Sequence, residues 1–412
     1  MQEKPLKKLV IIGSGFAGLR ALYRLSDYSY HFEVTMVDRH DYSLERPVLP
    51  EVALEDKPVE EVHIETPPQF RKHEAGFAWG EVVEIDTENK KVILDDGTKL
   101  SYDYLIIASG AVKDYDAIKG YREYGYSVCD DTEAARLHER LKSFEGGDIV
   151  TGAARSEFGH RVDAPELKAP CEGPVGEVMF MMDHRLREEG KRDKSTISVF
   201  SPSETFFEDV GDNARESVAK LMQERGITLH TGKELTEITE DSVIFSDGSA
   251  LPCDLAIIIP PYKAPEYIAK SGLGDDKGWV PTDKTMKHLD HDEIYAVGDI
   301  NALAQPKLGH IAINQADVAV FAILRREGLS DEEVPFTPEV FCIMNMGGHE
   351  AILIYSNVLY GGEYDIAWHS PIAKLMKLGF DEEYHYTHGH MPPDTVVEAL
   401  EGLLHRFAKQ KK

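Results

Sequence analysis

A short β-branched run that leads directly into a glycine-rich turn places the strongest constraint on the fold of this chain. Leu9–Ile12 reads as a strand, and glycines stand at positions 13, 15 and 18 before a helical pattern. Gly13 permits the tight turn, Gly15 lets the backbone approach a pyrophosphate, and Gly18 lets the helix pack closely on the strand. Asp38 ends the next strand, where a carboxylate can bind a ribose hydroxyl. The spacing predicts a dinucleotide-binding β-α-β unit.

Length and composition narrow the class of protein further. A chain of 412 residues is too long for one compact core, so two or three domains are expected. No apolar run approaches about 18 residues, which argues against a membrane-spanning helix. The polar start shows no signal-peptide core and predicts a cytoplasmic location. The net charge of −28 disfavours a nucleic-acid partner, and the four distant cysteines lack the spacing of a metal site.

Four further segments extend the glycine motif into a family resemblance. Tyr102–Ala111 (YDYLIIASGA) and Ile294–Ile300 (IYAVGDI) resemble the second and third flavin motifs of disulfide-reductase-like flavoproteins. Tyr42–Ala53 and Pro306–Val320 resemble the branch that contains type II NADH dehydrogenases and sulfide:quinone oxidoreductases. The resemblance implies FAD at the first nucleotide site, with Asp299 holding the ribityl chain of the cofactor.

Strands that alternate with helices, and a second unit that begins at Asp148, predict an α/β fold with parallel sheets. We expect two Rossmann-like dinucleotide-binding domains and a C-terminal membrane-associating segment. The expected boundaries are 1–112 and 266–330 for the two parts of the FAD domain, 113–265 for the second Rossmann-like domain and 331–412 for the C-terminal region. The residues expected to bind FAD are Gly13, Ser14, Gly15, Phe16, Ala17, Gly18, Asp38, Arg39, Val82, Ala108, Ser109, Gly110, Gly298, Asp299, Lys307 and Gly309.

The second glycine motif differs from the first in a way that bears on the electron donor. In the segment DIVTGAARSEFGH only Gly152 and Gly159 remain, and Ala154 and Arg155 intrude where a pyrophosphate would approach. The acid after the next strand is displaced to Glu204. These changes predict a vestigial NADH site and favour a donor other than NADH.

The placement of three cysteines agrees with the sulfide:quinone oxidoreductase branch. Cys171 precedes a helix, and Cys342 follows the flavin domain. Cys129 comes before both in the sequence and after the glycine motif. The resemblance implies that Cys171 and Cys342 form a redox pair at the flavin and that Cys129 lies near the 8-methyl edge of the flavin, where a covalent link is left open. We expect the helix-start and loop settings to favour thiolates at Cys171 and Cys342. We interpret Cys253 as an inert core residue.

The C-terminal region carries apolar residues at helical spacing. One stripe comprises Ile372, Leu375, Met376 and Phe380, and another comprises Val396, Leu400, Leu403, Leu404 and Phe407. Nearby bases, including Lys374 and Lys377, suit an anionic membrane surface. Periodicity alone favours packing on the protein or a dimer interface, but the need to reach a membrane quinone favours the membrane surface. The resemblance implies that Phe341 and Phe380 hold the quinone ring. The tract His385, His388 and His390 is interpreted as a solvated turn, not a metal site.

Together these features predict an FAD-dependent sulfide:quinone oxidoreductase that acts peripherally on the cytoplasmic face of the cell membrane. Its expected partners are sulfide, a membrane quinone and the membrane surface, and a homo-oligomer is compatible with the sequence. Lys307 is expected near the flavin or as a solvated lysine. Glu172 is a candidate proton acceptor beside Cys171, although a first-turn glutamate ordinarily only stabilises its helix. Two alternatives remain at this point: a type II NADH:quinone oxidoreductase, and a flavin-binding scaffold or redox sensor without turnover.

Overall fold

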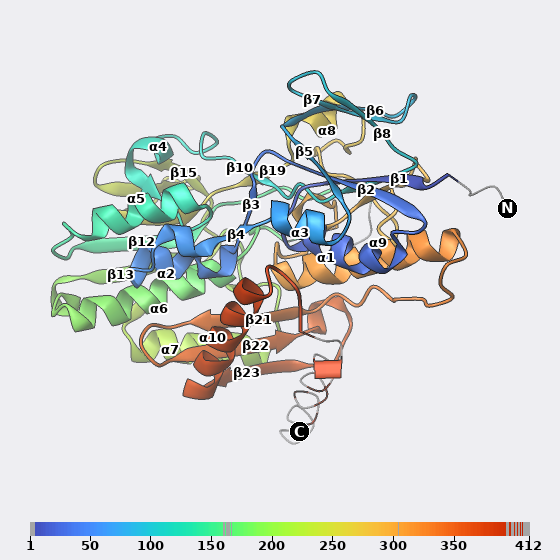
Figure 1. Ribbon diagram of the computed structural model, residues 1–412. Coiled ribbons are helices and arrows are strands. Elements are labelled where there is room, and N and C mark those ends of the chain that lie inside the picture. The colour runs from blue at the N-terminus through green and yellow to red at the C-terminus, as the bar shows by residue number, and fades with distance from the viewer. Residues whose placement is uncertain are drawn as a thin grey trace.

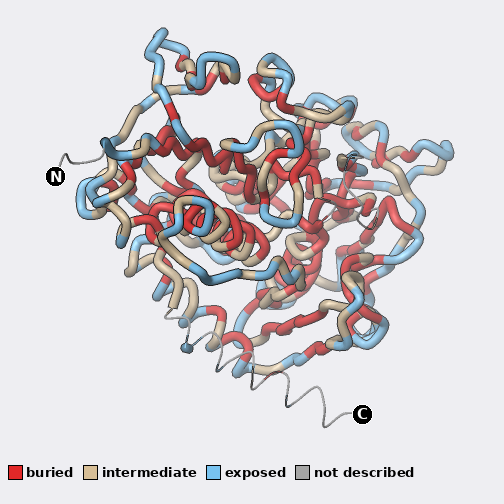
Figure 2. Tube along the Cα trace, turned by 90° about the vertical axis from the view of Figure 1, so that its right-hand side faces the viewer, coloured by how far each residue is buried: buried red, intermediate tan, exposed pale blue. Residues whose placement is uncertain are grey.

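The computed structural model describes residues 5–159, 161, 165, 167–303, 305–392, 395, 396, 399, 402, 404 and 406. Two parallel sheets, each flanked by helices, lie side by side, and a smaller antiparallel sheet closes the molecule beneath them (Figure 1). The interiors of the sheets are buried and exposed residues lie on the outer turns (Figure 2), whereas the connection 201–211 is largely buried. The prediction of an α/β fold with two dinucleotide-binding units is confirmed by the two parallel sheets.

The first sheet is parallel, with strand order β20-β9-β1-β2-β5. Its strands and the two helices packed together on one face are β1 (Lys7–Ile12), β2 (Phe32–Asp38), β5 (Gly76–Trp79), β9 (Tyr104–Ile107), β20 (Ile294–Ala296), α1 (Phe16–Leu25) and α9 (Gly309–Arg326). Successive side chains of β1 point to opposite faces of the sheet, and both faces are buried. Leu9 and Ile11 pack towards α1 and α9, whereas Val10 and Ile12 pack towards an antiparallel layer on the other face.

That antiparallel layer consists of β6 (Val82–Asp86), β7 (Lys91–Leu94) and β8 (Lys99–Ser101), with α8 (Glu266–Lys270) beside β6. Smaller elements complete this half of the molecule: β3 (Tyr42–Leu44), β4 (His63–Glu65), α2 (Leu49–Leu54) and α3 (Pro67–Lys72). Because β20 returns to the sheet edge after the second domain, segments far apart in sequence share one core.

The second sheet repeats this plan with order β11-β18-β12-β13-β14. Its elements are β11 (Gly125–Tyr126), β12 (Asp148–Ala153), β13 (Thr196–Phe200), β14 (Ile227–His230), β18 (Leu255–Ile259), α4 (Tyr121–Tyr124), α5 (Asp131–Leu141), α6 (Gly173–Glu188), α7 (Asp212–Glu224) and the meander β15 (Leu235–Ile238), β16 (Ser242–Phe245), β17 (Ala250–Pro252). The two halves of the molecule are connected by an antiparallel pair of short strands, β10 (Val112–Lys113) and β19 (Tyr262–Lys263).

The glycine turn of the second sheet differs from that of the first. In the first half, α1 starts four residues after β1 ends, whereas residues 154–172 separate β12 from α6. A Cβ on Gly152 would lie 2.5 Å from Cδ1 of Phe200, so the Phe200 side chain fills the space beside this strand end. Within the described part of this connection, no helix presents its N-terminus directly after β12.

The C-terminal sheet is antiparallel and three-stranded. It consists of β21 (Val340–Asn345), β22 (Ala351–Ser356) and β23 (Asp365–His369) and is followed by α10 (Pro371–Tyr386). Alternation along β21 turns Val340 and Met344 towards the core that contains α6, and Phe341 and Ile343 towards α10. Cys342 shares the face of Val340 and Met344 and packs against the same core.

In helix α10, two lysines that were expected to be exposed are buried. Lys374 and Lys377, expected at a membrane surface, are buried, because carboxylates under the helix bind both ammonium groups. The exposed apolar side chains are Ile372, Leu375 and Leu378, whereas Met376 packs against the C-terminal core. The assignment of these two lysines to an anionic surface is wrong.

The remaining C-terminal predictions fall partly outside the described residues. Val396 is exposed and Leu404 is buried, and Leu400, Leu403 and Phe407 lie outside the described positions. Within the described part of the chain, no helix is both long and apolar enough to cross a bilayer.

The interpretation of the histidine tract as a solvated turn is wrong for His390. Its ring stacks on Tyr23 of α1, with 3.5 Å between centroids, and burial lowers its pKa to about 4. The described residues contain no cluster of side chains suited to a metal ion.

Candidate active site

The glycine turn after β1 forms an open cradle. Gly13 has φ +100°, and a Cβ there would lie 2.4 Å from the backbone oxygen of Ala108. A Cβ on Gly18 would lie 1.9 Å from the backbone oxygen of Gly13, so strand and helix leave no room for a side chain at either position. At Gly15, by contrast, a Cβ would meet nothing within 4 Å. The open position lies at the N-terminus of α1, where a pyrophosphate binds favourably.

Polar groups surround this cradle where a nucleotide needs them. Asp38 lies at the end of β2 and accepts hydrogen bonds from the backbone N–H and the hydroxyl of Ser14, at 2.7 and 2.6 Å. Ser109 follows β9, and its hydroxyl lies 2.7 Å from that of Tyr267. Arg39 is exposed beside Glu81, and Val82 is buried at the start of β6. Phe16 stacks on Tyr384 of α10.

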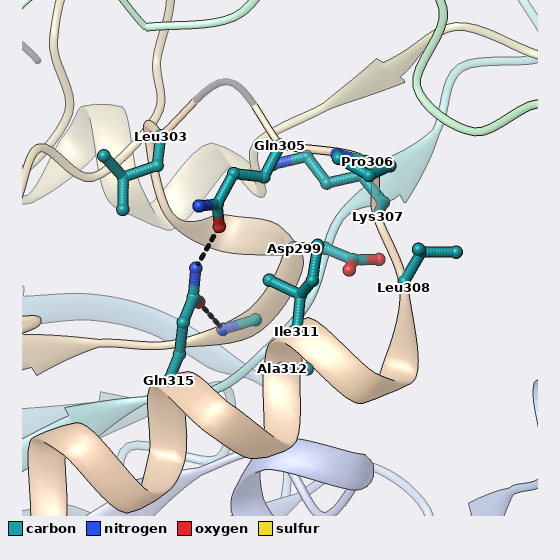
Figure 3. A pocket seen from close by; sticks show the side chains of 10 residues that line it. Asp299, Leu303, Gln305, Pro306, Lys307, Leu308, Ile311, Ala312 and Gln315 are labelled. Atoms are coloured by element: carbon teal, nitrogen blue, oxygen red, sulfur yellow. Dashed lines mark hydrogen bonds between the residues drawn. The ribbon is translucent and has the colours of Figure 1, made fainter. Parts of the chain in front are cut away.

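The third motif lines a small cavity at the start of α9. Figure 3 shows Asp299, Lys307, Leu308 and Gln315 around it, and Gly309 begins the helix. Gln315 Oε1 accepts a hydrogen bond from the backbone N–H of Gly298 at 2.7 Å, which fixes the turn that carries Asp299.

Lys307 is half-buried, so the interpretation of this residue as a solvated lysine is wrong. Its Nζ lies 4.6 Å from the centroid of the Trp279 ring, and burial lowers its pKa to about 8 although Asp299 opposes the shift. The backbone N–H of Lys307 donates to the carbonyl of Pro170 at 2.9 Å. This bond ties the third motif to the residue that precedes Cys171.

Cys171 and Cys342 border one small space at the start of α6. A Cβ built on Gly173 would lie 3.6 Å from Sγ of Cys342 and 3.8 Å from Sγ of Cys171. Cys171 arrives from the long connection after β12, and Cys342 from the middle of β21. The fold therefore brings together two cysteines that the sequence separates by much of its length.

The surroundings of these cysteines do not favour thiolates. Burial raises the pKa of the Cys171 thiol well above its usual range, and Asp209 adds to the shift. Burial also raises the pKa of Cys342 to about 12. The expectation that helix-start and loop settings favour thiolates is wrong here, because desolvation outweighs the backbone N–H groups at the helix start.

Cys129 is buried just before α5. The hydroxyl of Tyr262 donates to Sγ of Cys129 at 3.6 Å, and Arg46 donates to the Cys129 carbonyl at 2.6 Å. Lys113 Nζ lies 3.9 Å from the centroid of the Tyr262 ring, and burial lowers the pKa of Lys113 to about 8. Cys253 is also buried but belongs to a different hydrophobic cluster, beside Phe200 and Phe245.

Two carboxyl groups accompany the cysteine pair. Glu172 is buried, not an exposed first-turn glutamate, and accepts hydrogen bonds from the Ser201 hydroxyl and the backbone N–H of Glu208 at 2.6 and 3.2 Å. Burial raises the pKa of Glu172 to about 8. The pKa of Asp209 rises to about 6 for the same reason, and its Oδ1 is buried without a hydrogen-bond partner.

Sequence reasoning missed several of these groups. Asp209 and Tyr262 approach the cysteines only through the fold, since each follows a different strand of the second sheet. Lys113 carried a usable signal, because it stands three residues after Gly110 at the end of the second motif. Glu177 carried another, as a carboxylate within the apolar run of α6.

The two expected quinone residues lie on different elements, Phe341 on β21 and Phe380 on α10. Phe341 faces α10 from β21 and lies 5.7 Å from the ring of His310. Phe380 stacks on Tyr384, with 5.9 Å between centroids. The ring contacts of the described residues do not join Phe341 to Phe380.

Residues 7–155 and 185–316 match the family described as pyridine nucleotide-disulphide oxidoreductase. The match covers more than half of the chain, and this protein belongs to that family. It is 25% identical to the sulfide-quinone reductase of Aquifex aeolicus, over 97% of this chain and 95% of that protein. It is 24% identical to the mitochondrial sulfide:quinone oxidoreductase of Mus musculus, over 76% of this chain and 69% of that one.

The solved structure of the sulfide:quinone oxidoreductase from Aquifex aeolicus has the same fold. Its TM-score is 0.86 at 22% identity, with 96% of this chain and 95% of that chain covered. The family implies an FAD cofactor, and the open cradle at Gly15 and the Asp299 carboxylate fit one. Asp299, for which no hydrogen bond is present within the described residues, is suited to accept one from a ribityl hydroxyl.

We expect Asp299→Ala to purify with depleted FAD. A charge-assisted hydrogen bond contributes about 1.5–3 kcal/mol, so FAD affinity should fall by roughly 10- to 100-fold. The flavin-to-protein absorbance ratio and titration of the stripped protein with FAD measure the loss. Asp331→Ala, in the exposed loop after α9, is the matched control. Full flavin occupancy in Asp299→Ala would contradict the assignment.

Proposed function

We propose that this protein is a sulfide:quinone oxidoreductase that uses a Cys171–Cys342 pair and FAD to pass two electrons from sulfide to a membrane quinone. One observation carries the proposal: two cysteines from different domains border the same buried space at Gly173, and the backbone ties this space to the third flavin motif. Relatives named for this activity span almost the whole chain.

The cysteine pair supplies the sulfur chemistry. Hydrosulfide that attacks one sulfur of a Cys171–Cys342 bridge breaks the S–S bond, leaving a persulfide on one cysteine and a thiolate on the other. FAD, when bound, accepts two electrons from these sulfur atoms and passes them to the quinone. Because burial disfavours a thiolate at both cysteines, a nearby group must hold or exchange the proton. Asp209 and Glu172 are suited to this, since their pKa values of about 6 and 8 bracket neutral pH.

The end of β12 supports sulfide over NADH as the donor. Phe200 fills the space beside Gly152, and the connection 154–172 carries Cys171 to the position where a nucleotide-binding fold starts its helix. A nicotinamide dinucleotide at this site would lack both the close backbone approach and the helix N-terminus that bind pyrophosphate.

The exposed apolar face of α10 supports a peripheral membrane contact. Ile372, Leu375 and Leu378 are 55%, 67% and 46% exposed, and Trp368 lies just before the helix. An apolar surface beside Phe380 suits a quinone that enters from the bilayer. The cytoplasmic face, the Phe341 and Phe380 quinone contacts and any flavin link to Cys129 are further parts of this proposal.

The donor is tested by anaerobic flavin spectra. Micromolar sulfide should bleach the oxidised-flavin absorbance of the holoenzyme within the mixing time of a manual experiment, and NADH should bleach it slowly or not at all. Rapid bleaching by NADH would instead identify an NADH:quinone oxidoreductase. Failure of both donors would leave a flavin-binding protein without this turnover.

The cysteine pair is tested by single and double substitutions. Cys171→Ser and Cys342→Ser should each reduce sulfide-driven quinone turnover to below about 1% of wild type, and the double variant should be no worse, because the two residues act as one unit. FAD content should be unchanged in all three.

Cys253→Ser is the matched control, with normal turnover and a stability loss of about 1–2 kcal/mol. Cys129→Ser should retain part of the activity and lose any covalent flavin link. Normal turnover in both paired variants would refute the mechanism.

The membrane contact is tested by vesicle sedimentation. Leu375→Glu should weaken binding by about tenfold or more, since a leucine in an apolar phase contributes about 1.5–3 kcal/mol. Lys374 and Lys377 should contribute little to any dependence of binding on salt or anionic lipid, because both side chains are buried. Leu289→Glu, at another exposed leucine, is the control. Equal sedimentation of Leu375→Glu and wild type would exclude this face of α10 as the contact.

A further inference from the structure

A buried group of charges lies directly under α10 and adjoins the cysteine site. Lys377 is 4% exposed, and its Nζ lies 3.3 Å from Glu51, 3.3 Å from Asp381 and 3.9 Å from Glu177. The same ammonium donates to the Pro47 carbonyl at 3.0 Å. Glu45 belongs to the same electrostatic group, since Asp381, Lys377 and Glu51 all act on its pKa. We call Glu45, Glu51, Glu177, Lys377 and Asp381 the α10 charge cluster.

The cluster holds more acid than its bases neutralise. Among the described residues, Lys377 is the one lysine or arginine that forms ion pairs with these carboxyl groups. Lys57 acts from the partly exposed edge, and Lys374 lies 3.8 Å from Glu55. Glu45 is 3% exposed, and its Oε1 has no hydrogen-bond partner, as is also true of Glu51 Oε2. A purely structural ion pair would match charges one to one, because an unpaired buried carboxylate is costly. The excess acid groups must therefore hold protons.

The cluster has an inner end at the redox site. Glu177 lies on α6 and acts on the pKa of Cys342 more strongly than any other charge. Glu177 Oε1 accepts a hydrogen bond from the backbone N–H of Asn345 at 2.9 Å, and the Asn345 side chain donates to Glu51 Oε1 at 2.9 Å. Asn345 and Cys342 share β21, so one strand connects the cluster to the cysteine pair.

The cluster also has an outer end at the protein surface. His385 lies one turn after Asp381 on α10, and its Nδ1 is 3.4 Å from Glu45 Oε2. The side chain of His385 is 45% exposed, whereas that of Glu45 is 4% exposed. An imidazole that reaches both the solvent and a buried carboxyl group is suited to exchange protons between the two.

We propose that the α10 charge cluster stores protons and conducts them between the surface at His385 and the redox site for quinone reduction. The inference rests on the proposed function. Hydrosulfide loses two electrons and one proton as its sulfur joins the persulfide chain, and a quinone takes up two electrons and two protons. Each turnover therefore consumes one proton in total, and the bilayer beside α10 excludes the bulk water that would otherwise supply it.

The protonation of the cluster suits this task. Burial and the Asp381 charge raise the pKa of Glu45 to about 8, with Lys57 and Lys377 opposing and Glu51 adding to the shift. Burial raises the pKa of Glu177 to about 8 and that of Asp381 to about 6, in both cases against the attraction of Lys377. Glu45 is thus protonated below about pH 8 and loses its proton above it. A carboxyl group poised near the working pH transfers protons efficiently.

The test separates the two half-reactions in FAD-loaded enzyme by stopped-flow spectroscopy across about pH 5 to 9, which spans these pKa values. The flavin is reduced with sulfide in one series and with dithionite in the other, and is then reoxidised by a soluble quinone. In Glu45→Gln and Asp381→Asn, reoxidation should slow by about tenfold or more and lose its pH dependence, while bleaching by sulfide stays within about twofold of wild type. Glu382→Gln, an exposed acid on the same helix, is the matched control and should match wild type.

A second measurement does not depend on turnover. The infrared C=O stretch of a protonated buried carboxyl group should be present at neutral pH in wild type and in Glu382→Gln, and reduced in Glu45→Gln. Reoxidation at the wild-type rate and pH profile in both cluster variants, or an infrared band as intense in Glu45→Gln as in wild type, would overturn the inference. Absence of bleaching by sulfide in wild type would instead refute the proposed function, and the dithionite series would still test the cluster.

Discussion

The packing of β21 on α6 is the contact on which the site depends. It carries Cys342 from the C-terminal sheet to the start of α6, where Gly173 leaves room for both sulfur atoms. The same contact excludes water from the pair, and this burial raises the pKa values of both thiols. Burial, more than any single hydrogen bond, sets the chemistry available here.

The sequence predicted the elements whose signal is local. The glycine turn, the strand after it and Asp38 follow from steric rules that operate within a few residues, and the structure places them as expected. Cys171 and Cys342 were assigned through a family resemblance, because nothing in their spacing brings them together. Asp209 could not be found in this way, since it reaches the cysteines from a loop after β13 that only the tertiary fold positions.

The errors in the sequence interpretation share one cause, which is that burial cannot be read from polarity. Lys377 looked like a surface base but is enclosed by Glu51, Glu177 and Asp381. His390 looked like part of a solvated turn but stacks on Tyr23. In each case the partner lies on an element distant in sequence, so helical periodicity indicated which residues share a face but not what that face contacts.

The connection between β12 and α6 bears on how this chain can change over evolutionary time. A return to nicotinamide use would require a smaller residue in place of Phe200, a shorter connection and a new helix start, all in the segment that now presents Cys171. Each of these changes alone would remove a feature of the present site before the others could supply a new one. Because these features share one segment, a change to nicotinamide binding would depend on several substitutions at once.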